Sequence, residues 1–327
     1  MGLGLGVIGA GSMGSLHARV ITDSSDADLR WVSDPDPKAR EIVASRYSVH
    51  TMPEPASLVD LDAVIIASPT ETHAYWCTKA IEAGIPFLVE KPLSIDSDEV
   101  EAVTSAALEA GVPFTVGFVE RFNPAVRTVR GIINNPTYFS AVRHSPYVDR
   151  IRSGVSGDLM IHDVDLALRF MAAKPVSVTA SQAHIHPSSE SGAEDIAEAH
   201  IRFDNGGVAS LSASRAAQRK IRTLSVADLE VTAEIDLMRQ DVTIYRHVLS
   251  ASIKEDRPGY RQETIMEIPQ LRYRTEPLVA QLEHFKDLVE GKVEPASEVA
   301  GILRSHRVLE ACRRSVAEGR AVELDDA

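Results

Sequence analysis

Short apolar runs alternate with segments of helical periodicity in the first part of the chain. The apolar runs are Leu3–Ile8, Leu29–Ser33, Ala63–Ala67, Pro86–Val89 and Pro113–Phe118. The segments of helical periodicity lie near residues 12–23, 37–46, 71–83 and 96–110. Gly84 and Gly111 each stand between a helical segment and the next apolar run, where glycine commonly ends a helix. This alternation predicts a parallel sheet with crossover helices.

The pattern changes after Phe118, where strand-like runs follow one another. These runs are Tyr138–Arg143, Val176–Ala183, Ala197–Phe203, Val208–Ala213, Arg222–Val226, Val231–Asp236 and Asp241–His247. Helical periodicity is confined to residues near 123–134 and 157–171 and to Pro277–Glu290 and Glu298–Glu318. Asn205-Gly206-Gly207 separates two of the runs and is typical of a hairpin turn. Consecutive strands without intervening helices predict an antiparallel sheet.

The two patterns together predict an α/β protein of two domains. A length of 327 residues is natural for two hydrophobic cores. We place a dinucleotide-binding Rossmann domain at residues 1–119 and a substrate-binding and oligomerisation domain at residues 120–327. A C-terminal helix could also pack back on the first domain.

A glycine-rich loop joins the first predicted strand to the first predicted helix. Gly9, Gly11 and Gly14 are spaced as in a dinucleotide-binding loop, for a tight turn, close approach of a pyrophosphate, and helix packing against the strand. The N–H groups of Ser12 and Met13 open the helix and can bind phosphate. The alternative is a glycine-rich turn that binds nothing.

The acidic residue that such a site needs is present at the end of the second strand. Asp34 lies twenty residues after Gly14 and can accept hydrogen bonds from ribose hydroxyls. Its charge would repel a 2′-phosphate, and no arginine adjoins Asp36 to offset that repulsion. We therefore expect NAD rather than NADP as the cofactor.

Composition and charge exclude several other classes of protein. The formal net charge of −13 argues against a nucleic-acid-binding protein. No apolar stretch approaches the roughly 20 residues of a membrane-spanning helix, and we identify no signal peptide. Cys77 and Cys312 have no metal-ligand spacing, so we expect no metal site, and two lone cysteines favour a cytoplasmic location.

Polar residues follow two of the predicted parallel strands, at the edge where open α/β sheets bind ligands. Ser68, Thr70 and His73 follow the run Ala63–Ala67, and we expect them near the cofactor, although a helix cap and a surface histidine are the simpler interpretations. Glu90 and Lys91 follow the next run. A lysine there can point toward the nicotinamide or can be an ordinary solvated loop residue.

A second candidate cluster lies in the helix predicted near residues 157–171. Asp158 and His162 are four residues apart and would share one helical face. One interpretation is an acidic residue at a helix N-terminus with an i,i+4 ion pair. The other is a pair of groups for proton transfer.

These motifs together resemble the family of glucose–fructose oxidoreductase, inositol dehydrogenase and rhizopine-catabolism proteins (Gfo/Idh/MocA), over essentially the whole chain. The resemblance depends on the glycine loop with His17, Ser68-Pro69-Thr70 with His73, Glu90-Lys91-Pro92, and Asp158 with His162. It implies a Rossmann domain followed by an α/β domain with a large open, mainly antiparallel sheet, whose outer face often forms homodimers or homotetramers. Gly154-Val155-Ser156-Gly157 departs from the Gly-Gly-Gly run of many relatives, which affects the substrate loop.

The resemblance also implies roles for individual residues. Lys91, Asp158 and His162 would surround the reacting hydroxyl, and Glu90 would lie with Lys91 at the cofactor. The segments around Arg121 and Asn123, and around His162, are similar to members that oxidise UDP-N-acetylglucosamine at the 3-hydroxyl, so we count Arg121 and Asn123 as substrate-binding candidates. The implied activity is that of a dehydrogenase acting on CH–OH groups.

A basic segment inside the acidic chain favours an anionic substrate. Residues 121–152 contain six arginines against one aspartate, a net formal charge of +5. Arginine side chains suit phosphate and carboxylate oxygens, so we take Arg143, Tyr147, Arg150 and Arg152 as candidates to bind a nucleotide sugar. A solvated loop is the alternative. A dehydrogenase of an uncharged sugar or inositol, a regulatory protein that binds NAD without turnover, and an enzyme that uses NAD transiently all remain open.

Overall fold

The computed structural model describes residues 2–148, 153–254, 257–271 and 275–324. The chain forms two compact units, the first made of Met1–Val119 with Glu276–Arg307 and the second of Glu120–Thr275 with Val308–Ala327. The second unit is thus smaller than the segment 120–327 expected from the sequence. The reason is the apolar stripe of one helix, α7 (Pro277–Val289): Leu282 and Phe285 join the core of the first unit.

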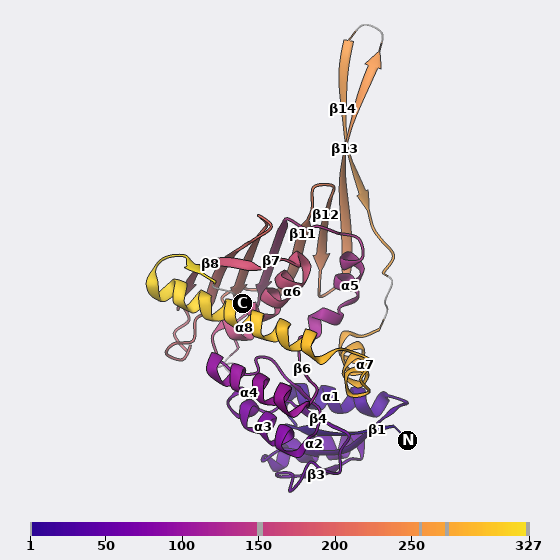
Figure 1. Cartoon of the computed structure of the whole chain (residues 1–327), viewed down its shortest axis with the longest axis vertical. Coiled ribbons are helices and arrows are strands. Elements are labelled where there is room, and N and C mark those ends of the chain that lie inside the picture. The colour runs from indigo at the N-terminus through magenta and orange to yellow at the C-terminus, as the bar shows by residue number, and fades with distance from the viewer. Residues whose placement is uncertain (1, 149–152, 255–256, 272–274, 325–327) are drawn as a thin grey trace. The chain divides into compact units, whose positions relative to one another are not determined.

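The first unit is built on a six-stranded parallel sheet with strand order β3-β2-β1-β4-β5-β6 (Figure 1). Its strands are β1 (Leu3–Ile8), β2 (Ala27–Ser33), β3 (His50–Met52), β4 (Ala63–Ile66), β5 (Phe87–Val89) and β6 (Phe114–Val116). Its other helices are α1 (Ser12–Asp23), the 3₁₀ turn η1 (Thr70–Thr72), α2 (Pro37–Tyr47), α3 (His73–Ala83) and α4 (Ser97–Ala110). The predicted parallel sheet is confirmed. The sequence did not predict β3, because its residues, His50–Met52, are partly exposed and do not form an apolar run.

The described strands of the second unit form one nine-stranded sheet with the order β14-β13-β12-β11-β7-β10-β9-β8-β15. They are β7 (Tyr138–His144), β8 (Pro175–Ala183), β9 (Ile196–Phe203), β10 (Val208–Ser214), β11 (Ile221–Ala227), β12 (Val231–Asp236), β13 (Asp241–Lys254), β14 (Arg257–Glu267) and β15 (Val322–Glu323). Neighbouring strands are antiparallel except β7 and β10. The expected large, mainly antiparallel sheet is confirmed, and Gly206, with φ of +83°, provides the turn between β9 and β10.

The helices of the second unit include one π-helical turn. They are the 3₁₀ turn η2 (Val119–Phe122), α5 (Pro124–Arg130), the π-helical turn η3 (Ser156–Met160) and α6 (Ile161–Met171), and α8 (Pro295–Glu318) belongs partly to each unit. α5 ends at Arg130, earlier than the predicted residue 134, and Gly131 is the residue that follows it. The π turn η3 leads directly into α6, and π turns inside helices frequently mark functional sites.

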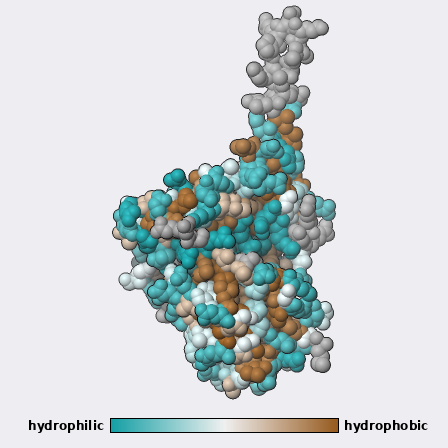
Figure 2. Space-filling view, viewed as in Figure 1, coloured by the Kyte–Doolittle hydropathy of each residue, from teal (hydrophilic) through white to brown (hydrophobic). Residues whose placement is uncertain are grey.

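β13 and β14 continue past the neighbouring strands as a two-stranded ribbon (Figure 1). β12 pairs with β13 only as far as Arg246, so the later residues of β13 pair with β14 alone. The predicted strand Asp241–His247 is thus the part of β13 that belongs to the wide sheet. Hydrophobic and hydrophilic residues lie side by side at the described base of the ribbon, where Val248, Ile265 and Met266 are exposed (Figure 2).

Within the described residues, every helix is too short or too polar to cross a membrane.

Candidate active site

The glycine loop has the backbone geometry of a dinucleotide site. Gly9 has φ of +100°, and a Cβ atom there would lie 2.5 Å from the carbonyl oxygen of Ala67. A Cβ atom at Gly14 would overlap the carbonyl oxygen of Gly9. A Cβ atom at Gly11, in contrast, would meet no protein atom within 4 Å. Two of the glycines are therefore required by protein packing, and the third leaves open space above the loop.

The start of α1 is suited to an anion. Gly11 is the N-cap residue and offers no side-chain hydrogen bond to the first turn, and that turn carries no acidic residue. Helix N-termini present N–H groups and a partial positive charge of the kind that binds pyrophosphate. Gly11 and Ser12 are exposed and Met13 is half-buried, so a ligand can reach this turn. These features fit the pyrophosphate of a dinucleotide.

Asp34 is fixed beside the loop in a position that fits a ribose. Its Oδ2 accepts a hydrogen bond from the backbone N–H of Ala10 at 2.7 Å, and its Oδ1 accepts one from Asp36 at 2.8 Å. A carboxylate has about four lone-pair positions, so both oxygens can also accept ribose hydroxyls. The structure corrects one expectation: Arg40 lies at this turn, donating to the carbonyl oxygens of Asp34 and Pro35 at 2.7 and 3.1 Å. That guanidinium is held by backbone carbonyls, which a sequence pattern does not reveal.

The segment after β4 is held to the segment after β5 by His73. The imidazole is buried, and its Nδ1 and Nε2 lie 2.8 Å from the carbonyl oxygens of Pro92 and Ser68 respectively. Burial lowers the pKa of His73, while the hydrogen bonds to the two carbonyl groups act in the opposite direction. Ser68 and Thr70 are half-buried, and Ser68 Oγ lies 2.7 Å from Thr72 Oγ1. His73 is thus a bridge between two loops at one edge of the sheet rather than a surface histidine.

Glu90 and Lys91 occupy different environments although they are adjacent. Glu90 is buried, and its Oε1 lies 2.8 Å from Nε2 of His17 on α1. Its carboxylate also fills the space beside Gly117, where a Cβ atom would lie 2.8 Å from Oε2. Lys91 is half-buried and precedes Pro92 through a cis peptide bond. Glu90 therefore ties α1 to the loop that carries Lys91.

Asp158 and His162 lie in the second unit, at the start of its helical segment. Asp158 belongs to η3 and His162 to the first turn of α6. Both side chains are half-buried, whereas Asp163 and Asp165 on α6 are buried. The segment therefore separates two kinds of polar residue, one kind still accessible to solvent and the other enclosed.

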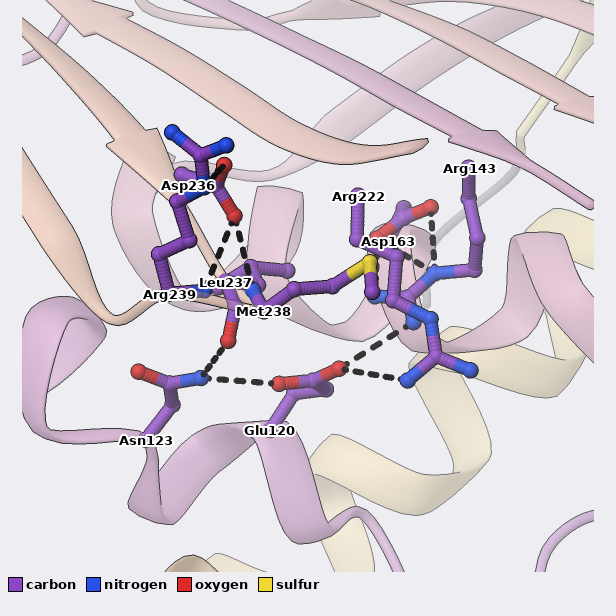
Figure 3. Close-up of polar contacts among 9 residues, drawn as sticks. All are labelled: Glu120, Asn123, Arg143, Asp163, Arg222, Asp236, Leu237, Met238 and Arg239. Carbon is purple, nitrogen blue, oxygen red and sulfur yellow. Dashed lines mark hydrogen bonds and ion pairs between the residues drawn. The ribbon is translucent and has the colours of Figure 1, made fainter. Parts of the chain in front are cut away.

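The enclosed aspartates bind two of the arginines that we expected to contact a substrate. Arg121 donates through Nε and Nη2 to both oxygens of Asp165, at 2.8 and 2.6 Å. Arg143 donates to Asp163 at 2.8–3.1 Å and to Glu120 at 3.1 Å (Figure 3). Burial opposes the charged form, but the charges of Asp163 and Glu120 raise the pKa of Arg143. These carboxylates already balance the positive charges of Arg121 and Arg143. The contacts therefore do not support the two arginines as ligands of an anionic substrate.

The remaining substrate-binding candidates fall into three situations. Asn123 is the N-cap of α5, and its Nδ2 donates to Glu120 and to the carbonyl oxygen of Leu237, at 3.2 and 3.0 Å (Figure 3). Tyr147 is half-buried, stacks on His186 with ring centroids 3.5 Å apart, and donates to the carbonyl oxygen of Ser188. Arg150 and Arg152 lie outside the described residues. Asn123 thus has a structural function, and Tyr147 stays a candidate.

Arg222 on β11 is a candidate that the sequence analysis missed. The Oε1 atom of Glu120, which accepts a hydrogen bond from Arg143, also lies 3.8 Å from Nη1 of Arg222 (Figure 3). The Arg222 side chain is 41% exposed, compared with 3% for Arg143. Burial and the like charge of Arg143 lower the pKa of Arg222, and the carboxylates of Glu120, Asp163 and Asp158 act in the opposite direction. An arginine near the start of a strand carries no motif, so only the fold identifies it.

Two family descriptions cover most of the chain. Residues 3–118 match the oxidoreductase family with an NAD-binding Rossmann fold, and residues 125–234 match the GFO/IDH/MocA C-terminal domain. The two matched segments correspond to the parallel sheet of the first unit and to most of the wide sheet of the second.

Individual relatives agree with these matches. The chain is 32% identical to UDP-N-acetylglucosamine 3-dehydrogenase from Acidithiobacillus ferrooxidans over 263 residues, covering 80% of this chain and 82% of that protein. It is 29% identical to inositol 2-dehydrogenase from Rhizobium meliloti over 342 residues, covering 98% of both.

Solved structures extend the likeness to the fold and the cofactor. UDP-N-acetylglucosamine 3-dehydrogenase from A. ferrooxidans superimposes with a TM-score of 0.81, at 28% identity over 97% of this chain and 98% of that one. GenD2 from gentamicin A biosynthesis, solved in complex with NAD, gives a TM-score of 0.82 at 26% identity over 99% and 97% of the two chains. With a glycine loop and an Asp34 that fit the same cofactor, the chain belongs to the GFO/IDH/MocA family of NAD-binding oxidoreductases acting on CH–OH groups.

Proposed function

We propose that this protein oxidises a secondary hydroxyl group of a sugar, with a nucleotide sugar as its preferred substrate. The observation that carries the proposal is the contrast along the segment from η3 to α6. Asp163 and Asp165 are buried in ion pairs, whereas Asp158 and His162 remain half-buried and accessible. A helix that leaves one acid and one imidazole accessible at its start has the groups that alcohol oxidation needs.

The three candidate side chains would divide the chemistry at the hydroxyl oxygen. His162 is the general base, because an imidazole titrates near neutral pH. Lys91 donates a hydrogen bond to the same oxygen and stabilises the alkoxide charge as it develops. Asp158 balances the charge of Lys91. Lys91 as the base is the alternative assignment.

Hydride acceptance comes from the nicotinamide ring when NAD is bound. The glycine loop and the start of α1 would hold the pyrophosphate, and Asp34 would hold the ribose. His73 and Glu90 fix the loops from which Ser68 and Lys91 extend.

Arg222 supports an anionic substrate. Its guanidinium is partly exposed and lies within electrostatic range of Asp158. Arginine binds phosphate oxygens through two parallel N–H groups. One relative at 32% identity is named for a UDP-sugar, and another at 29% is named for inositol. A dehydrogenase of an uncharged sugar or inositol is therefore the second candidate function.

Lys91→Met tests the catalytic assignment. We expect NADH formation to fall to background, while the Kd for NAD stays within about threefold, because the change removes an N–H donor from the alkoxide and leaves the glycine loop intact. Turnover is followed at 340 nm and NAD binding by calorimetry. Full activity in Lys91→Met would overturn the assignment.

A substrate screen of nucleotide sugars, free sugars and inositols separates the two candidate functions. We expect NADH to accumulate with a nucleotide sugar, which would also exclude a reaction that regenerates NAD in each cycle. Arg222→Gln should then raise the KM for that sugar about tenfold or more, since one charged hydrogen bond is lost. An unchanged KM, or activity with inositol alone, would favour the uncharged substrate.

We also expect a homodimer or homotetramer and a cytoplasmic location, as the sequence indicated. Light scattering coupled to size-exclusion chromatography measures the oligomeric state directly.

A further inference from the structure

The residues that precede Asp158 have no helix cap of their own. Val155 is the N-cap residue of η3, and its apolar side chain makes no capping hydrogen bond. Exposed N–H groups at a helix start are normally satisfied by Ser, Thr, Asp or Asn at this position. The turn that carries Asp158 therefore depends on a partner from elsewhere in the second unit.

Glu194, from the connection between β8 and β9, supplies that partner. Its Oε1 accepts a hydrogen bond from the backbone N–H of Ser156 at 2.7 Å, and its own carbonyl oxygen accepts one from Val155 at 3.1 Å. The Glu194 residue is only 7% exposed. A carboxylate at a helix N-terminus is also favoured by the helix dipole. Two successive N–H groups at the start of η3 are thus bound to one residue.

Gly154 makes room for this contact. A Cβ atom at residue 154 would overlap the carboxylate of Glu194. Gly157 differs, because a Cβ atom there would meet nothing within 4 Å. The carboxylate of Glu194 therefore explains the glycine at the start of the Gly154–Gly157 segment.

Arg215, which follows β10, holds Glu194 in place. Its Nη2 donates to the carbonyl oxygens of Ser153 and Glu194 at 2.6 and 2.8 Å. Its Nε lies 3.2 Å from Oδ1 of Asp195, a residue that is 0% exposed. Asp195 in turn accepts hydrogen bonds from the N–H groups of Ile185 and His186 at 2.7 and 2.8 Å. These contacts connect the turn before Asp158 to two strands of the wide sheet.

We infer that Glu194 is a positioning residue for Asp158 and His162, held by Arg215 and Asp195. This inference rests on the proposed function, because it matters to turnover only if Asp158 and His162 act on the substrate. Catalytic groups must be held within about 0.5 Å of the productive geometry, and a displacement of about 1 Å can cost about 100-fold in rate. A buried carboxylate bound to the first N–H of the segment provides that restraint.

Glu194→Ala and Glu194→Gln test the inference as a pair. We expect Glu194→Ala to lower kcat by about 10- to 100-fold, with KM for the sugar changed less than threefold and NAD affinity unchanged. Glutamine keeps an oxygen that can accept from Ser156, so Glu194→Gln should retain kcat within about threefold. The isotope effect on kcat with substrate deuterated at the reacting carbon should rise in Glu194→Ala, because hydride transfer becomes slower relative to product release.

Hydrogen exchange reports on the turn itself. We expect the amides of residues 156–160 to exchange at least tenfold faster in Glu194→Ala, with the rates in β9 and β10 unchanged. Gly154→Ala provides a second route, because its added methyl displaces the Glu194 carboxylate. The matched control is Glu198→Ala, since Glu198 is an exposed glutamate on β9 that binds Ser212, and it should leave kcat unchanged.

The outcomes separate this inference from the proposed function. A folded Glu194→Ala protein with normal kcat, while Lys91→Met is inactive, would overturn the inference and leave the proposed function standing. Normal activity in Lys91→Met would overturn the proposed function instead. If Glu194→Ala does not fold, Gly154→Ala and Glu194→Gln decide. A lower kcat in Gly154→Ala with kcat retained in Glu194→Gln supports the inference, and an unchanged kcat in Gly154→Ala would overturn it.

Discussion

The glycine loop of the first unit and the buried ion pairs of the second unit are held in their conformations by different interactions. The loop is shaped by backbone: Gly9 and Gly14 are required because any Cβ atom would strike a carbonyl oxygen. The second unit is fixed by side chains, with Arg121 and Arg143 enclosed by Asp165, Asp163 and Glu120.

This difference determines which residues can be recognised as functional. Wherever two backbone segments approach closely, only a residue without a Cβ atom fits, so the spacing of the glycines can be interpreted directly. An arginine enclosed by carboxylates stabilises the fold, whereas an arginine that solvent reaches can bind a ligand. Nη1 of Arg143 and Nη1 of Arg222 lie 3.1 and 3.8 Å from the same Oε1 atom of Glu120, yet only the Arg222 side chain has substantial exposure.

Arg143→Met should give the largest effect, on stability. The change leaves the buried carboxylates of Asp163 and Glu120 without their cation, and breaking a buried pair from one side costs about 3–5 kcal/mol. Urea unfolding measures the loss. The double variant Arg143→Met/Asp163→Leu should recover much of it, because fewer uncompensated charges remain.

Arg222→Met is the matched control for that prediction. Its distance of 3.8 Å to Glu120 and its 41% exposure limit the stability cost to about 1 kcal/mol or less. A similar loss of stability in the two single variants would contradict the distinction between an enclosed and an accessible arginine.

Gly11→Ala should have the next largest effect, on NAD binding. A methyl group there meets no protein atom within 4 Å but occupies space that a pyrophosphate needs. We expect the Kd for NAD to rise about 10- to 100-fold with the melting temperature nearly unchanged. Gly14→Ala should lose both affinity and stability, because its methyl overlaps the Gly9 carbonyl oxygen. Calorimetry and thermal unfolding distinguish the two; a stable Gly14→Ala protein that binds NAD normally would refute this account of the loop.

His73 should make stability depend on pH to a smaller extent. Burial lowers its pKa below the usual 6.5, so at acid pH the unfolded chain takes up the proton more readily. The contribution of His73 to the free energy of unfolding is therefore fully present above about pH 6.5. It falls as the pH decreases toward the folded-state pKa, by at most about 1.4 kcal/mol per pH unit. Comparing the melting temperatures of the wild type and His73→Gln from pH 7.5 to 5.0 isolates this contribution. Parallel curves would rule it out.

Arg314→Ala should have the smallest effect. Arg314 and Glu318 form an i,i+4 pair on α8 at 3.5 Å, with side chains 55% and 32% exposed. Exposed pairs of this kind contribute about 0.5 kcal/mol or less, so urea unfolding should show almost no change. A loss as large as that of Arg143→Met would mean that exposure is a poor guide to the value of a charge in this protein.

Much of the fold could be predicted because its elements are locally encoded. The run Ala63–Ala67 corresponds to β4, and Asn205-Gly206-Gly207 corresponds to the turn between β9 and β10. The π turn η3 and the full length of β13 could not be predicted. The first depends on a distant partner, Glu194, and the second on pairing with β14.

The candidate site divides in the same way. Asp34 could be placed beside the glycine loop from its position after β2, and it binds the N–H of Ala10. The bridging of two loops by His73, and the anchoring of α1 by Glu90, depend on carbonyl and imidazole groups from distant parts of the chain. Sequence patterns do not record such partners.

The sequence by itself determined the parallel and antiparallel sheets, the NAD loop and the family, because hydrophobic period and glycine spacing act over a few residues. Only the tertiary structure decided which charged groups are enclosed and which remain accessible. The physical reason is that the properties of a charge depend on the partners and the solvent around it, and folding brings those together from separate segments.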